Sequence, residues 1–194
     1  MSKGRLEAFS DGVIAIIITI MVLELAAPHS EGVPTLADLL PLWPAFLSYV
    51  LSFIFVGIYW NNHHHLLHSC KHISGAAMWA NLFHLFCLSL IPFGSAWMGE
   101  NTFAAWPVAL YGVMIWMCGL SYYTLERMLI RANGQDSLLA AAVGVDTKGL
   151  ISLGLYTAAI PLAFVNPWIA VGLYVLVAII WFIPDPRIER KFAE

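Results

Sequence analysis

The sequence predicts an all-α integral membrane protein with six transmembrane helices, and three observations support this fold class. First, 60% of the 194 residues are hydrophobic and only 11% are charged, whereas about 25% of an average soluble domain is charged. Second, apolar stretches alternate with short polar, Gly or Pro breaks. Third, the basic residues gather in alternate breaks. We therefore expect one domain, residues 1–194, with no separate water-soluble unit.

The expected spans cover residues 9–27, 44–62, 76–98, 104–125, 150–165 and 168–183. The first follows Lys3 and Arg5 and so resembles a signal peptide, but the acids Asp11 and Glu24 argue against a cleaved segment. The next three spans are each close to the about 20 residues that a helix needs to cross a bilayer. The last two are shorter and nearly continuous, which predicts a tight hairpin packed against the other helices.

The basic residues predict the orientation of the chain. The acids expected on the opposite side, Glu31, Asp38 and Glu100, have no Lys or Arg near them. By the positive-inside rule, both termini are expected in the cytoplasm, in a multi-pass protein of the inner (plasma) membrane. All nine basic residues lie before span one, between spans two and three, between spans four and five, or after span six: Lys3, Arg5, Lys71, Arg127, Arg131, Lys148, Arg187, Arg190 and Lys191.

Composition also excludes several classes of function. A net charge of −3 without a run of one sign gives no reason to expect a nucleic-acid partner. The three cysteines have no CxxC spacing, and no HExxH motif is present. The histidines do raise an alternative, a metal-dependent membrane enzyme or a proton-coupled carrier, but we find neither a catalytic triad nor inverted repeats. We expect no metal, no cofactor and no enzymatic activity, despite the cluster of His63, His64, His65, His68 and His72.

The first span differs from the others because it carries an acid at or inside the membrane, where ionisable groups are costly and usually functional. At about 100° per residue, Gly12, Ile20 and Leu23 fall within about 40° of Ile16, with Thr19 at the edge of this stripe. Asp11 lies about 140° away. The helix thus has a narrow aliphatic stripe and a polar anchor on different sides. Helix packing would also explain the stripe, and a helix N-cap would also explain Asp11.

Four short motifs in the first 100 residues carry a family resemblance. They are Arg5-x-x-x-Phe9-Ser10-Asp11, Tyr59-Trp60-x-Asn62-His63-His64, Trp79-x-Asn81-Leu82 with Ile91-Pro92-Phe93, and Gly99-Glu100. In this order they resemble the bacterial members of the transmembrane protein 175 family of potassium channels. The chain is richer in histidine than that pattern, at His65, His68 and His84, and Gly94 stands where a proline is expected.

The resemblance implies a passive, potassium-selective homotetrameric channel whose partners are its own copies, membrane lipid and permeant potassium ions. It implies a pore lined by the first helix, with no Thr-Val-Gly-Tyr-Gly filter, and a hydrophobic gate of aliphatic rings formed by Ile16, Ile20 and Leu23. Thr19 is then the candidate for selectivity. The motif residues are expected to anchor the first helix to the second and third, with His63 or His64 hydrogen-bonded near Ser10 and Asp11: Arg5, Phe9, Ser10, Asp11, Trp60, Asn62, His63, His64, Trp79 and Asn81.

Overall fold

The computed structural model describes residues 2–28, 33–144 and 146–182, and within these ranges every regular element is helical. This confirms the all-α prediction. The elements in chain order are α1 (Lys3–Ile20), the 3-10 helices η1 (Met21–Glu24) and η2 (Leu36–Leu42), α2 (Trp43–His68), α3 (Gly75–Ser89), α4 (Ile91–Glu100), α5 (Ala105–Asn133), α6 (Leu138–Val143), α7 (Thr147–Leu162) and α8 (Pro167–Phe182).

Four helical segments of the described chain are long and apolar enough to cross a membrane, namely Lys3–Glu24, Leu36–His68, Gly75–Glu100 and Ala105–Asn133. The helices α7 and α8 have 16 described residues each, which corresponds to about 24 Å against a hydrocarbon core of about 30 Å. The count of six spans and the cytoplasmic termini therefore stay predictions. Glu31, Arg187, Arg190 and Lys191, which entered the orientation argument, lie outside the described residues.

The helices extend beyond the apolar stretches that predicted them. The first begins at Lys3, the second continues to His68 and the fourth continues to Asn133, because hydropathy marks only the lipid-facing part of a helix. The third span is divided at Leu90 into α3 and α4, and Pro92, which lacks an N–H group, lies in the first turn of α4. The short helix α6 was not expected from the sequence.

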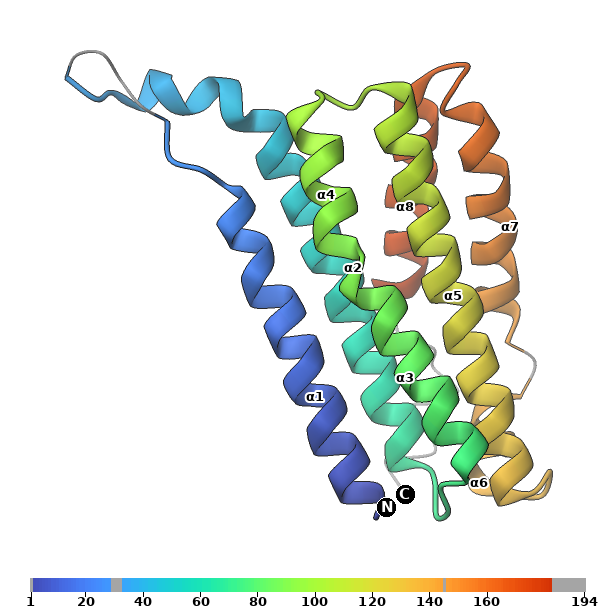
Figure 1. Cartoon of the computed structure of the whole chain (residues 1–194). Coiled ribbons are helices and arrows are strands. Elements are labelled where there is room, and N and C mark those ends of the chain that lie inside the picture. Colours follow the sequence, from blue (N-terminus) through green and yellow to red (C-terminus); the bar gives the residue numbers. More distant parts are fainter. Residues whose placement is uncertain (1, 29–32, 145, 183–194) are drawn as a thin grey trace.

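The bundle is built around α5, which packs against α3, α4, α7 and α8. The two short helices form the predicted hairpin, with α7 and α8 packed on each other and both on α5. The helix α1 runs along the edge of the bundle, as Figure 1 shows, and packs on α2 and α3. One long side of α1 is therefore uncovered in a single chain, and this arrangement positions the candidate site.

Candidate functional site

The helix α1 and its continuation η1 have one buried face and one exposed face. The exposed face carries the aliphatic stripe: the exposed fraction is 61% for Ile16, 41% for Ile20 and 76% for Leu23. These side chains face away from the bundle although they are among the most hydrophobic in the segment. The opposite face packs against α2 and α3 and is formed by Leu6, Ser10, Ile14, Ile17 and Met21.

The stripe continues through a change of helix type. The α-helix ends at Ile20, and residues Met21–Glu24 form a 3-10 helix, whereas the sequence arithmetic assumed one α-helix throughout. A 3-10 helix has three residues per turn, so residues at i and i+3 are eclipsed. Leu23 consequently stays in line with Ile20, and the stripe remains continuous.

Thr19 lies beside the stripe and is exposed. Its hydroxyl donates within its own helix, to the carbonyl oxygens of Ala15 (2.9 Å) and Ile16 (3.0 Å). Because the hydroxyl hydrogen is engaged with the backbone, the oxygen presents lone pairs rather than a donor to its surroundings. Such an oxygen can face a cation.

A buried chain of hydrogen bonds joins α1 to α3 and α2. The Ser10 hydroxyl donates to the Leu6 carbonyl oxygen (2.8 Å) and accepts from the Asn81 side-chain amide nitrogen (2.9 Å). The Asn81 side-chain oxygen lies 2.7 Å from His63 Nε2. Since the amide nitrogen of Asn81 donates to Ser10, its oxygen accepts, and the network assigns the hydrogen of His63 to Nε2. All three side chains are buried, so this chain fixes the rotation of α1.

A second, more exposed set of contacts joins α1 to α2. Trp60 Nε1 donates to Asp11 Oδ1 at 3.0 Å, and His64 Nδ1 lies 3.4 Å from Glu7 Oε1. Asp11 is not an N-cap, because α1 begins at Lys3. We expected His63 or His64 to be hydrogen-bonded near Ser10 and Asp11. In the structure, His63 is linked to Ser10 through the side chain of Asn81, and His64 contacts Glu7.

The other motif residues lie elsewhere. Arg5, Phe9 and Trp79 are exposed, Trp79 to 75%. Asn62 faces α5: its carbonyl oxygen accepts a hydrogen bond from the Tyr122 hydroxyl (3.2 Å), and its side chain donates to its own helix. The structure of one chain thus places six of the motif residues in contacts that hold α1 and leaves Arg5, Phe9, Asn62 and Trp79 outside them. The six are Ser10, Asn81 and His63 in the buried chain and Asp11, Trp60 and His64 in the more exposed set.

His84 is a buried polar residue that the sequence analysis recorded only as a departure from the family pattern. His84 Nδ1 lies 2.9 Å from Ser121 Oγ on α5, and its ring centroid lies 6.1 Å from that of His63. The spacing did carry a signal, because His84 follows Asn81 by three residues and so shares its helix face. The polar layer therefore extends from α1 through α2 and α3 to α5.

The histidine cluster is dispersed by the fold. His63 is buried toward α3, whereas His65, His68 and His72 are exposed. Among the described residues, no three His, Cys, Asp or Glu side chains are grouped so that they could hold a metal ion.

Comparison with known proteins identifies relatives over the whole length of the chain. A family model described as endosomal/lysosomal potassium channel TMEM175 matches residues 5–92. A protein of Chryseobacterium sp. named as a potassium channel is 51% identical over 194 residues, covering 100% of both chains. A protein of Chamaesiphon minutus, also named as a potassium channel, is 30% identical over 188 residues, covering 91% of each chain.

A solved structure shows the same fold. The crystal structure of a lysosomal potassium-selective channel TMEM175 homologue from Chamaesiphon minutus superposes with a TM-score of 0.79 at 28% sequence identity. The match covers 92% of this chain and 95% of that chain. The similarity therefore includes the region after residue 92, where the sequence motifs end.

Proposed function

This chain belongs to the TMEM175 family, and none of its matched members is named as an enzyme. Because the bacterial relatives that match it over most of its length are named as potassium channels, whereas vertebrate relatives that match a shorter part are named as proton channels, we propose that it conducts potassium passively. The observation that carries the proposal is the exposed aliphatic stripe of α1, opposite the polar face that holds α1 to the bundle. A stripe that only faces lipid would not need a fixed direction. The buried Ser10–Asn81–His63 chain fixes the direction of this one, which favours a specific role for it.

The pore in this proposal is formed by four copies, each contributing α1 to a central axis. Ile16, Ile20 and Leu23 would then form three successive aliphatic rings. Such rings offer no ligand to a dehydrated ion, and a narrow one closes a channel by excluding water. Conduction therefore requires the rings to widen, and the tetramer has a hydrophobic gate.

Selectivity in this proposal comes from Thr19, between the first two rings. Four hydroxyl oxygens supply dipoles of modest field strength, which favours potassium because it loses its hydration shell more easily than sodium. The acids Glu24 and Glu100 are exposed, and on the expected external side they raise the local concentration of cations. The polar network of α1, α2 and α3 serves as an anchor, not as a part of the ion path.

The proposed topology has six spans, with both termini in the cytoplasm of a bacterial cell and the chain in the inner membrane. Four segments meet the length and hydropathy of a span, and the α7–α8 hairpin packs beside them as a shorter pair. The described basic residues lie at the start of α1, after α2, near the end of α5 and at the start of α7, and these helix ends are on one side of the bundle in Figure 1.

The test is a current recording from purified protein in liposomes with a potassium gradient. We expect the current to reverse near the potassium equilibrium potential and to ignore an imposed pH gradient. A reversal potential that follows the pH gradient would contradict the proposal, because protons would then carry the current, as in a proton-coupled carrier or in the vertebrate relatives named as proton channels. Liposomes prepared in parallel without protein provide the baseline.

A further inference from the structure

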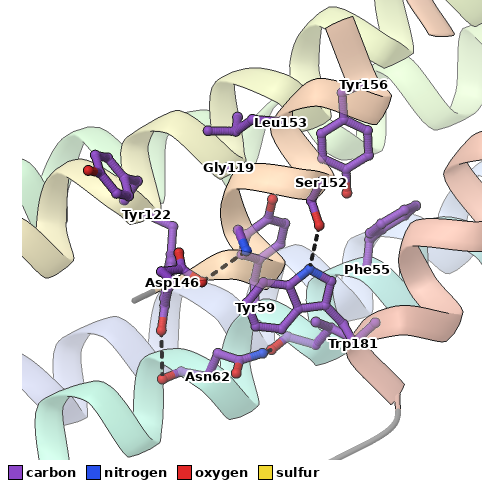
Figure 2. Close-up of a pocket in the computed structure, with 13 residues that line it drawn as sticks. Phe55, Tyr59, Asn62, Gly119, Tyr122, Asp146, Ser152, Leu153, Tyr156 and Trp181 are labelled. Atoms are coloured by element: carbon purple, nitrogen blue, oxygen red, sulfur yellow. Dashed lines mark hydrogen bonds between the residues drawn. The ribbon is translucent and has the colours of Figure 1, made fainter. Parts of the chain in front are cut away.

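A pocket lies among α2, α5, α7 and α8, outside the proposed pore and the α1 anchor (Figure 2). The space between the atoms that line it amounts to about 470 Å³, of which only a part is enclosed because the figure includes the open mouth. Six aromatic rings contribute to its walls, from all four helices: Phe55, Tyr59, Tyr122, Tyr123, Tyr156 and Trp181.

The polar hydrogens of three of these rings are already engaged. Trp181 Nε1 donates to Ser152 Oγ (2.9 Å), and the hydroxyls of Tyr122 and Tyr59 donate to backbone carbonyl oxygens at 3.2 and 3.4 Å. These three rings therefore have no polar hydrogen left to donate to an occupant. An aromatic lining of this kind attracts a cation through the negative faces of the rings.

The mouth of the pocket carries a carboxylate. Asp146 caps the N-terminus of α7, where its Oδ1 accepts from the Gly149 backbone N–H at 2.9 Å. A Cβ at position 149 would collide with this carboxylate, so a larger residue there would displace the Asp146 side chain. Among the described residues that line the pocket, none is Lys or Arg. The nearby Arg127 lies over the Tyr123 ring at 4.7 Å and 3.4 Å from Glu126, so its charge has a partner.

The arrangement is amphipathic along its depth. Asp146 caps the start of α7, and Asn62 lies about two turns before the end of α2. Phe55, Leu153 and Tyr156 line the pocket further along the same helices. We propose that this pocket binds an organic ammonium ion with an apolar body, the head at Asp146 and the body among the aromatic rings. The proposal does not depend on the proposed channel function, because it concerns binding to helices that do not line the pore.

The experiment is a fluorine NMR titration of para-fluorophenethylammonium with the purified protein in neutral-detergent micelles. The matched neutral ligand is para-fluorophenethyl alcohol, which has the same ring and chain. We expect saturable binding of the ammonium, about tenfold tighter than that of the alcohol. Equal binding of the two ligands, or no saturable binding above that of empty micelles, would overturn the proposal.

Three variants locate the site. Asp146→Asn removes the charge while keeping an oxygen that caps α7, and we expect it to abolish the preference for the ammonium. Asp136→Asn removes an exposed carboxylate from the loop after α5 and should leave binding unchanged. Gly119→Leu should block both ligands, because a Cβ there already approaches Leu153 to 3.1 Å. Unchanged binding in Asp146→Asn or Gly119→Leu, each checked for a native melting temperature, would place the ligand elsewhere.

A free amine and the amine head of a phospholipid share this chemistry. Adding phosphatidylethanolamine to the micelles distinguishes them. Displacement of the probe supports the cation site and assigns it to lipid, and persistent probe binding supports the cation site and assigns it to a soluble amine.

Discussion

Asn81 donates a hydrogen bond to Ser10 Oγ at 2.9 Å, and this contact joins α3 to α1, which runs along an edge of the bundle. Both side chains are fully buried. The contact sets which face of α1 is turned inward, and it thereby determines that Ile16 and Leu23 face outward. The predictions that follow test this division of α1 into an anchor and a pore-lining face.

Removing the hydroxyl of Ser10 should destabilise the protein. Ser10→Ala leaves the Asn81 amide without an acceptor in a buried site, at a cost of about 1–3 kcal/mol. We expect a lower melting temperature of the detergent-solubilised protein. Ser89→Ala is the matched control, because Ser89 is exposed and bonds only within its own helix. Equal melting temperatures of the two variants would show that the Ser10 contact does not hold α1.

Asp11 should affect assembly more than ion selectivity. Asp11→Ala removes the acceptor of the Trp60 hydrogen bond, and Trp60→Phe removes the donor. We expect each change to lower the tetramer yield on size-exclusion chromatography, and the double variant to lose less than the sum. A well-assembled Asp11→Ala variant with altered ion preference would instead place Asp11 in the ion path.

Chelation should leave conduction unchanged. The described histidines do not converge on a metal site with other ligands, so we expect the current to be the same after the protein is stripped with EDTA. The measurement is the potassium current before and after chelation, together with the metal content of the purified protein. Stoichiometric zinc that is lost together with the current would revive the metal-dependent alternative.

Introduced thiols should map the pore. Ile16→Cys and Leu23→Cys should react with a water-soluble thiol reagent only while the channel conducts. Ile17→Cys and Met21→Cys should stay unreactive, because these positions are 3% and 1% exposed on the inward face. Equal reaction rates at the inward and outward positions would contradict the assignment of Ile16 and Leu23 to the pore.

The native thiols give this experiment a low background. All three are buried, and for Cys70, in the turn after α2, burial raises the thiol pKa to about 11. Since the thiolate is the reactive form, Cys70 is almost entirely protonated and inert at neutral pH.

Much of the fold was predictable because transmembrane helices can be identified from hydropathy. The helical period also predicted that Ile16, Ile20 and Leu23 share one side of α1. It did not indicate which residue near Asp11 forms the buried hydrogen bond between α1 and α3. That residue is Ser10, because a small hydroxyl can satisfy its hydrogen bonds in a tight helix contact, whereas a carboxylate at such a place carries a high cost of desolvation.

Contacts between helices were less predictable, since they depend on the crossing of helices far apart in sequence. Asn62 lies one residue from His63, yet it faces α5 while His63 faces α3. The spacing places His84 on the same helix face as Asn81, but its hydrogen-bond partner Ser121 lies on α5. Trp79 belongs to a family motif but is exposed in the single chain. Local spacing contains no information on these partners.

The most direct test of the account is the effect of Ile16→Asn on current and ion preference. Asparagine is similar in size to isoleucine but lets water persist in the ring, which lowers the barrier to a hydrated ion. We predict a larger potassium current and weaker discrimination against sodium. Ile179→Asn, at a similarly exposed isoleucine of α8, should change neither. If Ile16→Asn leaves both quantities unchanged while Ile179→Asn alters them, α1 does not line the pore.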